Sequence, residues 1–75
     1  MKELVEYIAK SLVDNPDEVE IKEIENDRGI VLELKVAADD MGKVIGKQGK
    51  IARSIRTLTK AAAAKEGKRV NVEII

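Results

Sequence analysis

The segment MGKVIGKQGKIARSIR, residues 41–56, decides how this sequence is interpreted. It contains three glycines and five basic residues but no acidic residue. Glycine disfavours the interior of a helix, yet apolar residues at helical spacing continue on both sides of the glycines. We therefore expect two helices joined by the four-residue turn GKQG at 46–49, with positive charge gathered around the turn.

The helices on either side of this turn differ in length. Before the turn, a short helix is expected over 41–45, with Asp39 and Asp40 as candidates for its N-cap. After the turn, a longer helix is expected over 50–64, with Gly67 just past its C-terminal end. The apolar stripe expected to face the core, at spacings of four, three and four, comprises Ile51, Ile55, Leu58 and Ala62.

The first half of the chain predicts a helix followed by a hairpin. Residues 2–13 place apolar side chains at every fourth position, which is typical of an amphipathic helix, and the segment DNPD stops it. Residues 18–26 read as a strand, although Ile24 is out of phase with its apolar neighbours, so a bulge or an early strand end stays open. A short turn with Gly29 in a left-handed conformation then leads to residues 30–37, which alternate as a half-buried strand.

The last segment, residues 69–75, alternates again and predicts a third strand. Two helices lie between it and the strand at 30–37, so we expect these two strands to run parallel and side by side. The order is α-β-β-α-α-β, and residues 1–75 are expected to form a single domain. This order predicts an α+β fold with the helices packed on one face of a three-stranded mixed sheet.

Charge is strongly segregated along a chain whose formal net charge is zero. Residues 1–40 hold five basic and twelve acidic side chains, a net charge of −7. Residues 41–65 hold seven basic side chains and no acidic one, a net charge of +7. A net charge of zero argues against a polyanionic partner. A positive block of this length outweighs that argument and indicates such a partner.

Other functional classes find little support. The chain has no His and no Cys, and neither Ser11 nor Ser54 has a plausible base beside it, so we expect no enzymatic activity. No cofactor or metal is expected, and helix capping is the default role of Asp39 and Asp40. No apolar run approaches the length of a membrane span. The absence of cysteine and of an amino-terminal apolar segment favours a cytoplasmic location.

The GKQG turn has the chemistry of a phosphate cradle. Gly46 and Gly49 allow a phosphate to approach the main chain closely, and the amino end of the following helix favours negative charge. Lys47 and Gln48 at the tip offer a charge and hydrogen bonds. The neighbouring basic residues expected to help are Lys43, Lys50 and Arg53. The alternative is that the glycines only provide the geometry of an elbow between two helices.

The residues VIGKQGKIARSI resemble the signature of the K-homology (KH) domain, (I/V)IGxxGxxI. The GxxG loop would be Gly46 to Gly49, with Ile51 or Ala52 near the closing apolar position. The element order is similar to the type II, prokaryotic form of that fold. The resemblance extends over the whole chain, through LVEYIAKSLVDNPDEVEI and IRTLTKAAAAKEGKRVNVEII, to the small single-domain bacterial KH proteins of the KhpA type.

This resemblance implies binding of single-stranded RNA without catalysis, in the role of an RNA chaperone or post-transcriptional regulator. The GxxG loop of a KH domain clamps about four backbone nucleotides, a role that falls here on Gly46, Lys47, Gln48 and Gly49. Val44 or Ile45, with the outward edge of the second strand, would form the wall of the base-binding groove. Expected partners are a second copy of the chain and a larger KH-containing protein of the KhpB (Jag/EloR) type.

A rival hypothesis remains beside RNA binding. The acidic and basic halves also suit a protein–protein interaction module, in which oppositely charged surfaces join head to tail or contact a partner. The discriminating question is whether the glycines and charges of the 46–49 turn serve RNA binding or only assembly.

Overall fold

The first half of the chain forms a helix and a hairpin, as expected. In the computed structural model, which describes residues 1–75, helix α1 covers Lys2–Leu12 and a 3-10 turn follows at Pro16–Glu18. Strands β1 (Glu20–Asn26) and β2 (Gly29–Lys35) form an antiparallel hairpin. Gly29 has a φ of 128°, and a Cβ there would lie 2.3 Å from the Arg69 carbonyl oxygen, which explains why glycine is needed.

The second half supplies the turn between two helices and the last strand. Its elements are a 3-10 turn at Ala38–Asp40, helix α2 (Met41–Ile45), a 3-10 turn at Lys47–Gly49, helix α3 (Lys50–Lys65) and strand β3 (Val70–Ile74). Helix α3 ends in a Schellman motif around Gly67, whose φ is 69°. In that motif the amides of Gly67 and Lys68 donate to the Ala64 and Ala63 carbonyls at 3.0 and 2.9 Å.

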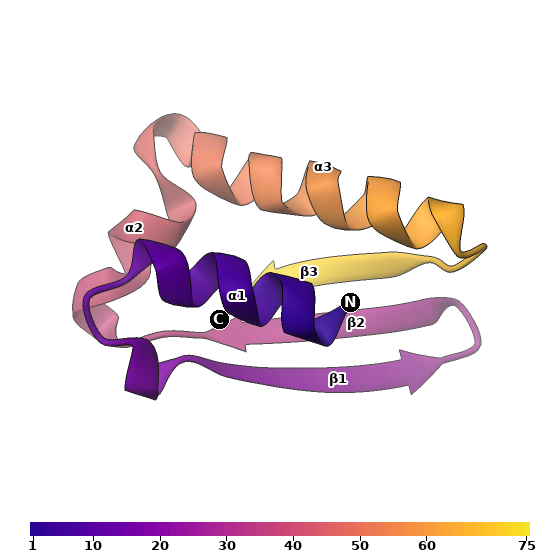
Figure 1. The fold of residues 1–75 in the computed structure, drawn as a ribbon, viewed down its shortest axis with the longest axis horizontal. Helices are drawn as coiled ribbons and strands as arrows, with labels where there is room; N and C mark the ends of the chain where they lie inside the picture. Colours follow the sequence, from indigo (N-terminus) through magenta and orange to yellow (C-terminus); the bar gives the residue numbers. More distant parts are fainter.

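The three strands form one mixed sheet in the order β1-β2-β3. Strand β2 pairs antiparallel with β1 and parallel with β3, in a register that runs from Ile30 opposite Val70 to Leu34 opposite Ile74. The helices lie on one side of this sheet, with α3 beside β3 (Figure 1). The predicted α+β architecture is therefore confirmed.

The core lies between this face of the sheet and the helices. Helix α1 contributes Val5 and Ala9, and α2 contributes Val44, each with 0% of its surface exposed. The alternation predicted for β2 is confirmed, since Leu32 and Leu34 are also fully buried. The remaining members of the core cluster are Val19, Ile21, Val36, Ile55, Ala63, Val70 and Val72.

Ile24 does not mark a bulge or a strand end. Strand β1 continues through it to Asn26 without a break in register, and Ile24 lies directly opposite Val31 of β2. Both side chains are half-buried, on the face of the sheet that the helices leave open. The out-of-phase residue therefore forms a small apolar cross-strand pair, which stabilises the hairpin from its outer side.

The buried face of α3 is rotated from the predicted one. Ile55 is buried as expected, but Leu58 is 57% exposed, so the predicted stripe is wrong at that position. The side chains of α3 that reach the core are small or polar apart from Ile55 and the partly buried Ile51. Thr59 satisfies its buried hydroxyl by donating to the Ile55 carbonyl at 2.7 Å. The four buried positions are Ala52, Ile55, Thr59 and Ala63.

Candidate nucleic-acid interface

The turn at 46–49 has three consecutive or near-consecutive residues with positive φ. The φ angles are 75° at Gly46, 56° at Gln48 and 73° at Gly49. Gln48 is the only residue other than glycine with a positive φ in the chain, and this left-handed conformation is uncommon outside glycine. The chain therefore reverses sharply between α2 and α3 and presents the backbone of the turn outward.

Two backbone hydrogen bonds hold the turn in place. The Gly46 amide donates to the Gly42 carbonyl at 2.8 Å, and the Gly49 amide donates to the Gly46 carbonyl at 3.1 Å. Glycine is required at position 46 by packing as well as by φ, because a Cβ there would lie 2.5 Å from Cγ1 of Ile51. Position 49 is different, since a Cβ would meet no atom within 4 Å.

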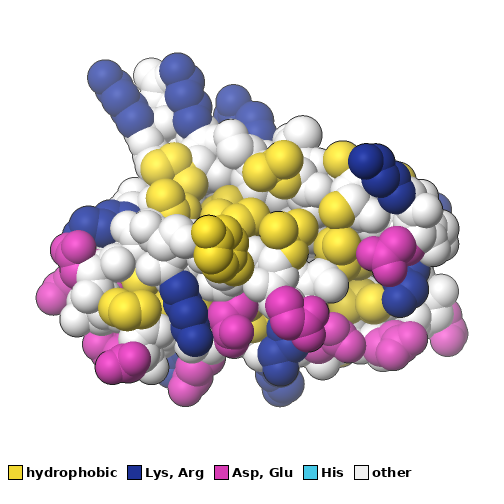
Figure 2. Space-filling model, viewed as in Figure 1, with side chains coloured by type: hydrophobic (Ala, Val, Ile, Leu, Met, Phe, Trp, Pro, Cys, Tyr) yellow, Lys and Arg dark blue, Asp and Glu magenta, His cyan; other side chains and the backbone are white.

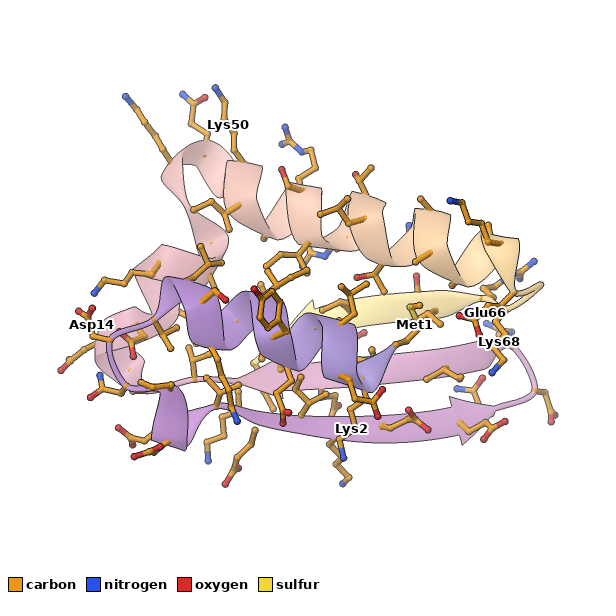
Figure 3. All side chains as sticks on the ribbon, viewed as in Figure 1. Met1, Lys2, Asp14, Lys50, Glu66 and Lys68 are labelled. Carbon is orange, nitrogen blue, oxygen red and sulfur yellow. The ribbon has the colours of Figure 1, made fainter.

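Most of the basic side chains around the turn are free of acidic partners. Of the fourteen Lys and Arg residues, only Lys43 and Arg56 have side chains that make a hydrogen bond or an ion pair within the protein. Lys50 extends away from the body of the protein at the start of α3 (Figure 3). Figure 2 shows that basic side chains project from the same end of the molecule and that acidic side chains lie along the opposite side. The unpaired cations of the basic block are Lys47, Lys50, Arg53, Lys60 and Lys65.

Lys43, predicted as an RNA contact, is engaged elsewhere. Its Nζ lies 2.8 Å from an Asp14 carboxylate oxygen and 3.5 Å from one of Asp40. The hydrogen bond to Asp14 is the largest cause that raises the pKa of Lys43 above its ordinary value of 10.5. Asp14 lies at the end of α1, beside α2 (Figure 3). Lys43 therefore joins α2 to the end of α1 instead of standing free beside Lys47.

Asp40 does not cap α2 with its side chain, contrary to prediction. Its carboxylate is fully buried and accepts hydrogen bonds from the Asp14 amide at 3.1 Å and the Asn15 amide at 3.0 Å. The Asn15 side-chain amide donates a third bond at 3.0 Å. Asp39, the other candidate, is exposed and makes no side-chain hydrogen bond to the helix.

The environment of Asp40 stabilises the charged form of its carboxylate. Burial alone raises the pKa, because it removes the carboxylate from water. The three hydrogen bonds from residues 14 and 15 and the nearby charge of Lys43 outweigh burial and hold the pKa of Asp40 below its ordinary value of 3.8. A charged, fully bonded carboxylate therefore fixes the end of α1 against the start of α2, the short helix that leads into the 46–49 turn.

The structure separates the two groove candidates on α2. Val44 has 0% of its surface exposed and belongs to the core, so the prediction that it contacts a ligand is wrong, while Ile45 is 38% exposed next to the turn. The prediction for the second strand is also wrong. Strand β2 is central and is hydrogen-bonded on both sides, so the open edge beside α3 belongs to β3.

Sequence reasoning missed one contact at this edge. The Arg56 Nε donates a hydrogen bond to the Val72 carbonyl at 3.2 Å, which connects α3 to the open side of β3. No local signal in the sequence marks Arg56, because the contact depends on which strand lies at the edge. The only available hint was the helical spacing, which places Arg53, Arg56 and Lys60 on one face of α3.

These features define a class of protein. A GxxG turn between two helices, in an α-β-β-α-α-β chain with a parallel β2–β3 pair, is the arrangement of a type II KH domain. The KhpA/KhpB KH domain matches residues 2–74, and the chain belongs to that family. No helix is both long and apolar enough to cross a membrane.

Known proteins similar to this chain carry consistent names. RNA-binding protein KhpA of Caldanaerobacter subterraneus subsp. tengcongensis is 69% identical, and that of Clostridium acetobutylicum is 68% identical, each over the full length of both chains. RNA-binding protein KhpA of Aquifex aeolicus is 52% identical over all of this chain and 95% of its own. A crystal structure of an Aquifex aeolicus Era variant bound to GDP and AlF4⁻ has the same fold over 97% of this chain and 28% of its own, with a TM-score of 0.66 and 22% identity.

Proposed function

We propose that this protein binds single-stranded RNA without catalysing a reaction, with the backbone of the RNA seated on the 46–49 turn. The observation that carries the proposal is the combination of an outward-facing glycine turn with a cluster of cations that no acidic group neutralises. Lys47, Lys50 and Arg53 all lie in or within one helical turn of it. The RNA-binding names of the family members support the same conclusion.

The turn acts by chemistry that any RNA sequence supplies. Gly49 leaves room for a phosphate at the main chain, and Gly46 lets the chain turn closely against Ile51. The first amides of α3 lack partners within the helix and point toward the phosphate. Lys47 and Gln48 supply a charge and an amide at the tip. Ile45, exposed beside the turn, offers an apolar surface for a base. Val44 and Lys43 contribute only indirectly, by fixing α2 in place.

Binding of this kind suits a sequence-tolerant role. A site that grips about four nucleotides mainly through their backbone holds many RNAs weakly, which fits a cytoplasmic RNA chaperone or post-transcriptional regulator. The chain has a single Tyr and no Phe or Trp, so stacking of bases on aromatic rings is not its mode of recognition. Weak single sites gain affinity when two are joined.

The test is fluorescence anisotropy of a labelled single-stranded RNA, titrated with wild type and with the double variant Lys47→Asp/Gln48→Asp. Aspartate tolerates the left-handed conformation of position 48, so the turn keeps its shape. We expect wild type to bind with a log–log salt slope of about −1.4 to −2.8, for two to four phosphate contacts on a single strand. The double variant is expected to lose at least tenfold in affinity.

The matched control is Lys2→Asp/Asn26→Asp, which makes the same change in net charge away from the turn. Both positions are exposed, an acidic residue in the first turn of α1 suits the helix dipole, and aspartate at 26 retains the oxygen that accepts from the Arg28 amide. We expect this control to bind RNA nearly as well as wild type. Equal losses in both double variants would show that binding follows overall charge and would contradict the assignment to the turn.

A second proposal concerns assembly, and it rests on exposed apolar side chains. Leu58 of α3 and Tyr7 of α1 are 57% and 73% exposed, and a band of hydrophobic side chains crosses the face formed by α1 and α3 (Figure 2). Within this band a hollow of about 480 Å³ is lined by residues of both helices, with Lys65 and Glu66 at its border. The apolar lining consists of Leu4, Leu58, Ala61 and Ala62.

We propose a second copy of the chain as the occupant of this apolar face. A two-fold axis brings the same patch of each copy together, and an axis that passes close to Lys65 and Glu66 would set Lys65 of one copy near Glu66 of the other. The patch is therefore complementary to itself in charge as well as in hydrophobicity. A heterodimer with a larger KH-containing protein of the KhpB type is the alternative that the family name supports.

A further inference from the structure

Strand β1 is an outer strand of the sheet, and its outward side carries unpaired backbone groups. The Ile30 amide of β2 donates to the Arg69 carbonyl, so the even-numbered residues of β2 point their backbone groups toward β3. In the register of the hairpin, these residues lie opposite the odd-numbered residues of β1. The backbone groups of the odd-numbered residues therefore face away from β2, where no further strand lies. They belong to Ile21, Glu23 and Glu25.

The side chains along this edge are predominantly acidic. Residues 17–27 hold six acidic side chains and one basic side chain, a net charge of −5. None of the six takes part in an ion pair, since the three ion pairs of the protein involve other carboxylates. Figure 2 shows acidic side chains along the side of the molecule where β1 runs in Figure 1. The edge therefore combines open hydrogen-bonding groups with negative charges that have no partner.

Charge decides which strand can pair with this edge. Charged side chains on an edge strand prevent sheets from associating edge to edge. Pairing two copies of β1 would bring their glutamates together, and like charges opposite each other in a strand pair are destabilising. The basic block of this chain is also excluded, because residues 41–65 form α2, α3 and the turn between them. The strand that fits is an extended basic segment of another protein.

We propose that the open edge of β1 binds such a segment, which joins the sheet as a fourth, antiparallel strand. Backbone hydrogen bonds to the odd-numbered residues of β1 supply affinity, and alternate side chains supply specificity. On the face toward the helices, the segment places Lys or Arg opposite Glu23 and Glu25. Long side chains have room beside this edge, in a hollow of about 640 Å³ with Glu6 of α1 and Glu23 among its walls and Lys2 at its border.

The other face of the sheet favours uncharged residues in the segment. There the neighbours on β1 are Lys22, which repels a basic side chain, and Ile24, which is half-buried beside Val31. The recognised pattern is therefore an alternation of basic and uncharged residues. This inference goes beyond the proposed RNA binding, because the acidic edge and the basic turn are separate surfaces. Together they would connect an RNA to a basic protein segment.

The test is an anisotropy titration of a labelled octapeptide of four Lys-Thr repeats, at low ionic strength and without RNA. Amide hydrogen exchange, followed by NMR, is measured with and without the peptide. We expect saturable binding and at least fivefold slower exchange at the amides of Ile21, Glu23 and Glu25. No saturable binding, or binding that leaves these three amides unprotected, would overturn the proposal.

A matched peptide isolates the backbone contribution. It has the same sequence and charge but carries N-methyl groups on its lysines, whose amides point toward β1 in the proposed antiparallel pairing. We expect it to bind at least tenfold more weakly, because it cannot donate hydrogen bonds to the edge. Equal affinity of the two peptides would show that charge alone attracts them, and strand addition would be wrong.

Two variants at one position separate charge from backbone in the protein. Glu25→Gln removes only the charge and is expected to weaken binding about two- to fivefold. Glu25→Pro also removes the outward amide, without breaking the pairing with β2, and is expected to weaken binding a further two- to tenfold or so. The control is Glu73→Gln, which removes an exposed charge from β3 and should leave binding unchanged. Equal affinities of the two Glu25 variants would contradict the proposal.

The remaining outcomes distinguish this inference from the proposed function. Lys47→Asp/Gln48→Asp should bind the peptide at least as tightly as wild type, and Glu25→Pro should retain RNA binding. A protein that binds RNA but not the peptide would refute this inference alone. Reduced self-association of Glu25→Pro would identify a second copy as the occupant and would also refute it. Thermal unfolding checks that each variant folds, and the N-methylated peptide provides the backbone test if Glu25→Pro does not.

Discussion

At the scale of single residues, the two glycines of the 46–49 turn have different reasons to be glycine. Both have a positive φ, but only Gly46 is also in tight contact, with Ile51 packed against the place where a side chain would begin. Gly49 faces open space, which is where a phosphate would approach. One glycine therefore serves the fold, and the other leaves room for a ligand.

Alanine substitutions should separate these two roles. We expect Gly46→Ala to lower the free energy of unfolding by about 2–4 kcal/mol, because it combines a strained φ with a steric clash. Gly49→Ala should cost about 1–2 kcal/mol, from the strained φ alone. Urea denaturation followed by circular dichroism measures both. Equal losses in the two variants would contradict the packing role of Ile51.

RNA affinity should follow the opposite order once folding is taken into account. At temperatures where both variants remain folded, Gly49→Ala places a methyl group on the outward side of the turn and is expected to weaken RNA binding several-fold. The folded fraction of Gly46→Ala is expected to retain more of its affinity. The anisotropy titration described above, corrected for the folded fraction, gives the comparison.

At the scale of elements, the Asp40 network connects α1 to α2 and so supports the turn. The pKa of Asp40 is lower in the folded protein than its ordinary value of 3.8. Its contribution to stability is therefore complete above pH 3.8 and is lost as the pH falls through the folded pKa. Lys43 acts in the other direction, since its raised pKa means that its contribution is complete below 10.5 and is lost at higher pH.

We expect Asp40→Asn to lower the urea midpoint at neutral pH and to flatten the fall in stability as the pH drops below 3.8. Asparagine has one acceptor oxygen and cannot satisfy all three donors from residues 14 and 15. The control is Asp39→Asn, because Asp39 is exposed and makes no such bonds. An acid transition that is the same in Asp40→Asn and wild type would contradict the role of this carboxylate.

Element positions could be predicted from the sequence, while the faces of some elements could not. Alternation and helical spacing located all three helices and all three strands, and the crossover rule placed β3 parallel to β2. The prediction of the buried face of α3 was wrong because it favoured Leu58, which is more hydrophobic than Thr59 or Ala63. The small side chains of Thr59 and Ala63 instead let the helix pack closely. Asp40 was misassigned because its partners lie 25 and 26 residues away in the chain.

For the candidate site, too, the sequence predicted some features and missed others. Local pattern identified the glycine turn and its cations, because both are contiguous in sequence. It could not decide between Val44 and Ile45, since adjacent residues of a one-turn helix differ only in which neighbour covers them. It also could not find Arg56, whose partner Val72 belongs to a strand at the edge of the sheet. Contacts between distant segments require the fold.

At the scale of the whole molecule, the exposed apolar face of α1 and α3 predicts self-association. We expect Leu58→Asp to convert a dimer into a folded monomer in sedimentation equilibrium, because Leu58 is 57% exposed in the isolated chain and lies outside its core. The control is Thr57→Asp, an exposed neighbour outside the apolar lining. A dimer that survives Leu58→Asp would place the interface elsewhere. Joining two turns in one particle also raises affinity for a long RNA.

The separation of charge described above has a consequence for how the protein behaves on a chromatographic column. Its isoelectric point is about 6.3, so a mildly alkaline buffer gives the average surface a slight negative charge, and ordinary practice would choose an anion exchanger. Because the basic end acts on its own at short range, the same protein should also be retained by a sulfated resin such as heparin. A polyanion responds to the surface that it touches, and the overall balance of charge is a poor guide to that surface.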